Sequence, residues 1–215
     1  MRTTRRVTAG LTVAVAASLG AATLLGSSAQ AASTMALGHK SLAAVLTSDG
    51  NRFDHNSRDF DIVTEAVLAV LAAKPHSPVS VLTKGRTALT AFVPTDRAFE
   101  KLASGLAGTK IMSERKAFNT VAGLGIDTVE TVLLYHVVPG ATITAKQALA
   151  SDGANLTTAQ GGTVKVLIRG GKNPSVWLRD KDPDFRDAQV VAPDINRGNR
   201  QIAHGVNRVL LPLNI

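Results

Sequence analysis

Asp96 and His136 are the candidate pair for acid-base chemistry in this sequence, and His204 is a second candidate histidine. Asp96 follows Thr95 where an apolar stretch gives way to a helical one, and His136 follows Tyr135 at the end of another apolar stretch. An aspartate and a histidine that converge in a fold, as Asp96 and His136 could, can transfer protons during ester hydrolysis. The common roles are structural: Thr95 can accept a hydrogen bond from an amide of the first helical turn, and Asp96 can stabilise that helix end. A histidine in such a place is more often hydrogen-bonded within the core.

Motifs of catalytic and cofactor sites are missing. The sequence has no Gly-x-Ser-x-Gly elbow, no His-Glu-x-x-His pair, no phosphate loop and no dinucleotide fingerprint. Two separated histidines are a poor basis for a metal site. The acidic stretch 179–187 begins like a calcium loop, but Phe185 stands where such a loop needs glycine and Val191 where it needs glutamate. We therefore expect no catalytic residue, metal or cofactor, and a solvated turn at the acidic stretch.

Composition narrows the class of protein further. The 215 residues include no cysteine, which excludes disulfide scaffolds, thiolate zinc sites and iron–sulfur clusters. The formal net charge is +8. The sequence has no long cluster of basic residues, and its few aromatic residues are a poor basis for stacking on bases, so nucleic-acid binding is not expected.

The first 31 residues have the pattern of an export signal. Arg2, Arg5 and Arg6 precede an uncharged stretch that ends in Ala-Gln-Ala at positions 29–31. The alternative is an uncleaved membrane anchor, because the stretch is long enough to span a bilayer. Cleavage after Ala31 would remove the three arginines and leave a charge of +5, too diffuse to name a partner. No transmembrane segment is expected in the mature chain.

Local patterns place helices mainly in the first half of the chain and strands mainly in the second. The predicted helices are 42–46, one from Asp59 or Asp61 to Pro75, 95–102, 113–121, one with a capping box at Asp127 that ends at Tyr135-His136, and 144–150, which opens with a second capping box from Thr144 to Gln147. The predicted strands are 89–93, 156–159, 163–169, 175–179, 189–192 and 202–211. Alternating apolar residues around a Gly-Gly turn at 161–162 predict that the second and third of these strands form a hairpin. This segregation predicts an α+β fold rather than an alternating α/β sheet.

Three blocks of the sequence share a recognisable pattern. Residues 90–99 read Thr-Ala-Phe-Val-Pro-Thr-Asp-Arg-Ala-Phe, residues 133–140 Leu-Leu-Tyr-His-Val-Val-Pro-Gly, and residues 203–212 Ala-His-Gly-Val-Asn-Arg-Val-Leu-Leu-Pro. In order, spacing and context these blocks resemble the fasciclin domain family, particularly its secreted single-domain bacterial members. The resemblance implies a β-wedge of mostly antiparallel strands flanked by several helices.

The third block departs from the family pattern at three positions. Ala203 stands where a β-branched residue is common, Gly205 where valine is common and Asn207 where aspartate is common. The last difference argues against any role that depends on a carboxylate at position 207.

The resemblance also implies a function. It indicates a secreted or extracellular domain, including a cell-wall-associated one, for adhesion or for binding a surface or matrix component, protein or glycan, without catalysis. The binding residues that it implies are Tyr135, His136, Thr95, Asp96 and His204. Two alternatives stay open: a hydrolase of ester-linked plant or cell-wall polymers, and a carrier of a small apolar ligand between helices and sheet.

The simplest domain organisation has three parts. Residues 1–31 form the export signal, residues 32–58 an N-terminal segment that packs on the domain, and residues 59–215 a single fasciclin-like domain.

Overall fold

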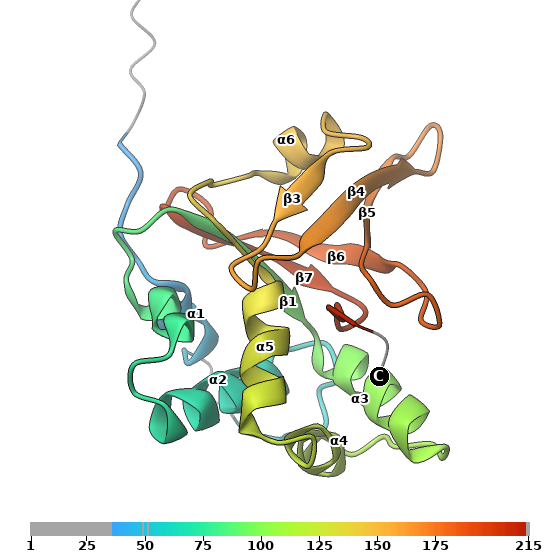
Figure 1. Cartoon of the computed structure of the whole chain (residues 1–215). Helices are drawn as coiled ribbons and strands as arrows, with labels where there is room; N and C mark the ends of the chain where they lie inside the picture. Colours follow the sequence, from blue (N-terminus) through green and yellow to red (C-terminus); the bar gives the residue numbers. More distant parts are fainter. Residues whose placement is uncertain (1–35, 49, 51, 214–215) are drawn as a thin grey trace, which may run out of the picture. The chain divides into compact units, whose positions relative to one another are not determined.

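The computed structural model describes residues 36–48, 50 and 52–213 (Figure 1). The expected export signal, residues 1–31, lies outside the described residues. Among those described, no helix has the length and apolar character needed to cross a membrane. In chain order the elements are α1 (Leu42–Leu46), α2 (Asp61–Ala73), the 3₁₀ helix η1 (Pro78–Thr83), β1 (Leu89–Pro94), α3 (Asp96–Ala107), α4 (Glu114–Ala122), α5 (Ile126–Tyr135), β2 (Val137–Pro139), α6 (Ala145–Leu149), β3 (Asn155–Thr157), β4 (Thr163–Arg169), β5 (Ser175–Arg179), β6 (Ala188–Ile195) and β7 (Gln201–Val206).

The strands form a seven-stranded sheet in the order β2-β1-β7-β6-β5-β4-β3. Neighbouring strands are antiparallel except for β1 and β7, which run parallel with Leu89 opposite Gln201. Beyond β3, the amide of Ala159 donates to the carbonyl of Val137 in β2 at 2.7 Å, so the two edges approach and the sheet nearly closes into a barrel. The predicted α+β fold is confirmed.

Helices α2 to α5 pack together beside β1 (Figure 1). Strand β1 is buried along its whole length and separates two apolar clusters. Because successive side chains of a strand point to opposite faces, Ala91 and Val93 pack with the helices while Phe92 packs inside the sheet with Tyr135. The first block of the sequence thus connects the two cores.

Of the two predicted capping boxes, one forms and the other does not. The capping box of α6 is confirmed, with Thr144 and Gln147 each bonding the backbone of the other. The capping box expected at Asp127 does not form. Helix α5 starts after Gly125, whose φ of 91° suits glycine, and the exposed Asp127 carboxylate pairs instead with Lys74 at 2.7 Å.

The last strand is shorter than the predicted 202–211. Strand β7 ends at Val206. Beyond that point the amide of Leu210 donates to His136 Nε2 at 2.8 Å instead of to a neighbouring strand. The His136 side chain therefore accepts a backbone hydrogen bond that a neighbouring strand would otherwise accept, and the chain leaves the sheet.

The unusual glycine of the third block has a steric explanation. A Cβ atom at Gly205 would lie 2.8 Å from the Ala192 Cβ atom and 3.0 Å from Cζ of Phe60. The Phe60 ring thus uses the space that a larger residue at position 205 would need.

Candidate functional site

His136 is a structural link rather than a free acid or base. Its ring is 4% exposed, Nδ1 lies 2.7 Å from the carbonyl of Val132, and Nε2 accepts the amide of Leu210 at 2.8 Å. Because Leu210 N is the donor, Nε2 carries no proton and Nδ1–H donates to Val132. Burial lowers the pKa of His136 to about 4, so the ring is neutral at pH 7.

His204 is held in the opposite tautomer. Its Nε2–H donates to the carbonyl of Ile143 at 2.8 Å, and its Nδ1 accepts the amide of Asp194 at 3.2 Å. The ring is 1% exposed and stacks on Phe92 with centroids 5.9 Å apart. Burial lowers the pKa of His204 as well. Both nitrogens are occupied, which leaves none for proton transfer or metal binding.

Tyr135 is enclosed between helix and sheet. Its hydroxyl donates to the carbonyl of Thr163 at 2.7 Å, and the side chain is fully buried. Burial, with the nearby Asp180 carboxylate, raises the pKa of Tyr135 to about 12. A Cβ atom at Gly162 would lie 2.9 Å from the ring, so this glycine admits the tyrosine.

Thr95 is the N-cap of α3, as predicted, but its side chain makes no capping hydrogen bond. That part of the prediction is wrong. The first amides of α3 find other acceptors: Asp96 N donates to Asp59 O at 3.1 Å, and Arg97 N donates to Ser57 O at 2.8 Å. The loop before α2 therefore caps α3 with backbone carbonyls, which leaves the hydroxyl without that task.

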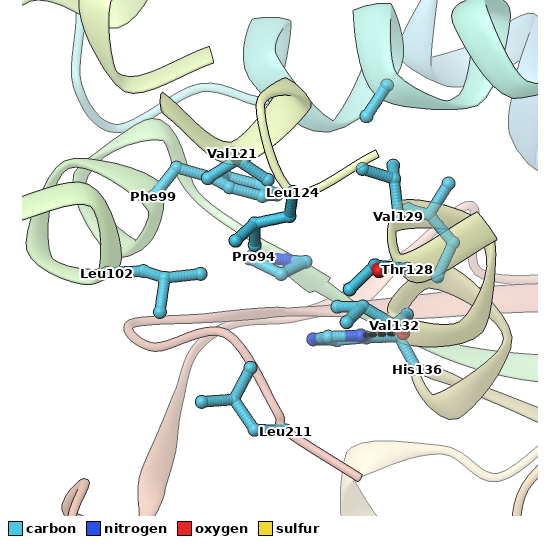
Figure 2. A pocket seen from close by; sticks show the side chains of 12 residues that line it. Pro94, Phe99, Leu102, Val121, Leu124, Thr128, Val129, Val132, His136 and Leu211 are labelled. Carbon is cyan, nitrogen blue, oxygen red and sulfur yellow. Dashed lines mark hydrogen bonds between the residues drawn. The ribbon is translucent and has the colours of Figure 1, made fainter. Parts of the chain in front are cut away.

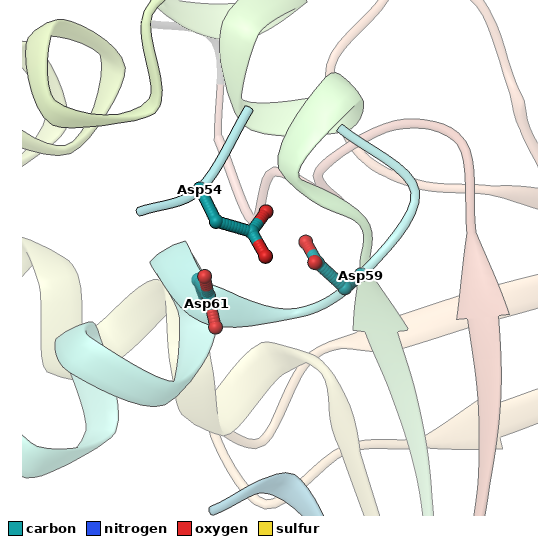
Figure 3. Close-up of side chains that lie close together, drawn as sticks. All are labelled: Asp54, Asp59 and Asp61. Atoms are coloured by element: carbon teal, nitrogen blue, oxygen red, sulfur yellow. The ribbon is translucent and has the colours of Figure 1, made fainter. Parts of the chain in front are cut away.

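Asp96 lies in a buried cluster of carboxylates. It is the first residue of α3, Asp61 is the first residue of α2 and Glu114 the first of α4; all three are 3% exposed or less. Each places one oxygen within 4.8 Å of those of the other two. Asp54 and Asp59 come from the loop before α2, and Figure 3 shows their carboxyl groups facing each other close to Asp61. We call these five residues the carboxylate cluster.

The carboxylate cluster has oxygens without partners. Asp59 Oδ1, Asp96 Oδ2 and Glu114 Oε1 are buried and accept no hydrogen bond. Burial, together with the neighbouring Asp59, raises the pKa of Asp96 to about 8. The positive ends of three helices offset part of the charge. Among the described residues, no ion pair joins Asp59, Asp96 or Glu114 to a basic side chain.

An apolar cavity of about 20 Å³ lies beside the His136 ring, bounded by Phe99, Val121, Val132 and Leu211 (Figure 2). This is the volume of about one water molecule, whereas ligand sites measure roughly 300–1,000 Å³. A second apolar hollow, of about 110 Å³, lies between α2, α4 and α5. Neither has the size of a site for a carried ligand.

The acidic stretch is not simply a solvated turn. Asp182 is 5% exposed, and its Oδ1 accepts the amides of Asp184 and Phe185. Asp180 Oδ2 accepts the amide of Leu211 at 2.8 Å. The stretch therefore anchors the end of the chain, a role that adjacent sequence could not show.

A groove of about 390 Å³ lies along α3 and the segment that follows it. Its lining includes four cations, Arg97, Lys101, Lys110 and Arg208, with the buried Glu100 among them. Among the described residues, no ion pair neutralises any of the four. We call this feature the basic groove.

The cations of the basic groove repel one another. Lys101 donates to the carbonyl of Asn207 at 3.0 Å, which holds it near the segment that carries Arg208. Burial lowers the pKa of Lys101, and the charges of Arg208 and Arg97 lower it further. An anion in the groove would relieve this repulsion.

The sequence analysis predicted neither the carboxylate cluster nor the basic groove, although the sequence contains part of the signal for each. Arg97 and Lys101 are four residues apart on one helix and share a face. Asp61 and Glu114 stand in first helical turns, where acids are common. The approach of separate helix starts, and of Arg208 to α3, depends on tertiary structure.

The fold defines an α+β module. The three sequence blocks, residues 90–99, 133–140 and 203–212, lie largely buried in it and support its structure. The Fasciclin domain family matches residues 65–212, and the chain belongs to this family. The expected resemblance is confirmed. Fasciclin domains are associated with cell adhesion and are typically extracellular or surface-associated.

Solved structures agree on the fold. The chain is similar to the FAS1 domain pair from the insect cell adhesion molecule Fasciclin I, with a TM-score of 0.55 and 15% identity over 81% of this chain and 51% of that one. This chain thus spans about half the length of that structure. The comparison with curated proteins gives no match.

Proposed function

We propose that this chain is a secreted, adhesion-type domain that binds a negatively charged component of a cell surface, matrix or wall, protein or glycan, and performs no catalysis. The observation that carries the proposal is the basic groove, whose four cations face about 390 Å³ of open space without a paired carboxylate. Unpaired cations along a concave surface attract anionic partners.

The lining of the groove suits a polymer rather than a small anion. Arg97 and Lys110 are exposed, while Lys101 and Arg208 are half-buried. Met112 adds an exposed apolar contact, with 58% of its surface accessible. A chain with repeated negative charges can contact several of these groups together.

The five candidate residues from the three sequence blocks contribute to binding by holding the binding surface in place. His136 holds the amide of Leu210, and Thr95 N donates to Val206 O at 3.0 Å. These two bonds fix the segment that presents Arg208. We propose Tyr135, His136, Thr95, Asp96 and His204 as positioning residues for the binding surface.

The hydrolase and carrier alternatives have less support. Asp96 bonds the amide of Ile62 and lies among carboxylates, whereas His136 bonds Val132 and Leu210. The two side chains are thus engaged separately, and both nitrogens of His136 are used. The apolar cavities are too small for a carried ligand of ordinary size.

We further propose residues 1–31 as an export signal, 32–58 as a segment packed on the domain and 59–215 as the domain itself. Supporting the packed segment, Leu42 and Leu46 belong to the same apolar cluster as α2, and Leu42 N donates to Gln201 Oε1 at 2.8 Å.

Binding can be tested on immobilised polymers. We expect saturable retention on an anionic polysaccharide or an acidic peptide, and release at about 1 M salt, where charges are screened beyond about 3 Å. Equal retention on a neutral polysaccharide would contradict the proposal. Release of product from a chromogenic ester, abolished in a folded His136→Ala variant, would favour the hydrolase instead.

A further inference from the structure

We propose that the carboxylate cluster binds a hard divalent cation, with Ca²⁺ as the best fit. The donors are Asp54, Asp59, Asp61, Asp96 and Glu114, which come from three helix starts and the loop before α2. The basic groove is a separate feature, so this proposal does not rest on the proposed function.

The spacing of the oxygens suits a shared ion. In each of two overlapping groups, Asp54 with Asp59 and Asp61, and Asp61 with Asp96 and Glu114, the candidate atoms lie within 4.8 Å of one another. Calcium binds oxygen at about 2.4 Å, so two ligands of one ion can lie up to about 5 Å apart. One ion can therefore contact oxygens from either group without large movement.

Unpartnered oxygens give a second, independent indication. Asp96 and Glu114 are 0% and 3% exposed, yet Asp96 Oδ2 and Glu114 Oε1 accept no hydrogen bond. Buried polar atoms almost always have a hydrogen-bond partner, and a bound ion is one of the few explanations for one that does not. The other oxygen of each side chain is used: Asp96 Oδ1 accepts Ile62 N, and Glu114 Oε2 accepts His55 N.

These second bonds orient the donors. They leave the unpartnered oxygen of each carboxylate for the cluster, and backbone amides fix the side chains that carry it. A site whose ligands are held in this way loses less entropy when it binds an ion.

The donor set selects the kind of cation. All five side chains supply oxygen only, which suits hard ions. Calcium accepts six to eight oxygens in flexible geometry, whereas magnesium demands an octahedron and retains several waters. Carboxylates that come from separate elements match the flexible coordination of calcium better.

A shared proton is the competing explanation. Burial and the neighbouring Asp59 raise the pKa of Asp96, so a proton can replace the cation at acidic pH. Cation binding would then release protons, and affinity would rise with pH. The charged groups that act on Asp96 include Asp59 and Glu114, both acidic.

The test uses the full chain, freed of metal with EDTA and titrated calorimetrically with Ca²⁺ and, separately, Mg²⁺ at about pH 8. We expect saturable Ca²⁺ binding, a rise in melting temperature and proton release that differs between buffers. Asp59→Asn tests the first group of oxygens and Glu114→Gln the second. The variant in the group that holds the ion should bind it about 10-fold or more weakly. Asp127→Asn, which removes an exposed carboxylate beside another helix start, should bind like the wild type.

The outcomes are distinct. Tighter binding of Mg²⁺ than of Ca²⁺ at the same residues would support the cation site and would show that its preferred ion is Mg²⁺. If neither cation produces heat or a shift in melting temperature at about 10 mM, above the weakest calcium modules, the proposal is overturned in favour of the shared proton. Unchanged binding in both folded variants, Asp59→Asn and Glu114→Gln, would overturn it as well.

Discussion

Asp96 Oδ1 accepts the backbone amide of Ile62 at 2.9 Å, so the first residue of α3 caps the start of α2. In return, the amide of Asp96 donates to the carbonyl of Asp59 at 3.1 Å, just before α2. Each helix start thus supplies the acceptor that the other needs. This exchange joins the first block to the helical layer and places a carboxylate where water cannot solvate it.

The ionisation of Asp96 should therefore oppose folding. Its folded pKa of about 8 lies above the usual aspartate value of about 4, so its contribution to stability is present at low pH and is lost as pH rises toward 8. Asp96→Asn retains an oxygen for Ile62 and cannot ionise. In EDTA, denaturant unfolding should show a larger gain in stability for this variant at about pH 8.5 than at about pH 5. An equal gain at both values would argue against a protonated Asp96.

His136 should make the fold sensitive to acid. Its pKa falls from 6.5 to about 4 on folding, so its contribution is present above pH 6.5 and is lost as pH falls toward 4. The loss would amount to about 3 kcal/mol. His136→Gln should lower stability at pH 7 but flatten this acid-side loss relative to the wild type, as measured by denaturant unfolding. The matched control is His76→Gln at an exposed site, which should leave the dependence of stability on pH unchanged. If His136→Gln lost stability with falling pH as steeply as the wild type does, the account would be contradicted.

Two threonines at helix starts should respond differently to the same substitution. Thr144 accepts a capping bond from Gln147 N, whereas the Thr95 hydroxyl caps nothing. Thr144→Val should cost about 1 kcal/mol of unfolding free energy. Thr95→Val keeps the shape of the buried side chain and should cost less, as measured by thermal melts of both variants. Equal losses would show that the Thr95 hydroxyl has a stabilising role.

Local patterns were sufficient to predict most elements and the fold class. Helix α6 follows from its capping box, and the hairpin of β3 and β4 from alternating apolar residues around a Gly-Gly turn. The 3₁₀ helix η1 and the short strand β2 were not predicted, because neither is long enough to show a period. The α+β segregation came from these same local signals.

The candidate sites depended on contacts that no local pattern encodes. Thr95 reads as a capping residue, but the carbonyls of residues 57 and 59 displace its side chain from that role. The role of His136 required knowing that Leu210 leaves the sheet beside it. Similarly, Arg208 adds to the charge of α3 only because β7 lies parallel to β1. Each case joins residues far apart in the sequence.

Charge reversal in the basic groove tests the central claim most directly. Arg97 and Lys110 are both exposed, so Arg97→Glu with Lys110→Glu should leave the fold intact. Lys172→Glu with Arg186→Glu changes the net charge equally at exposed positions outside the groove lining. The measurement is the dissociation constant for an anionic polysaccharide at low salt. The account predicts about 10-fold or greater weakening in the groove variant and a much smaller effect in the control; equal weakening in both would show that binding follows net charge and not the groove.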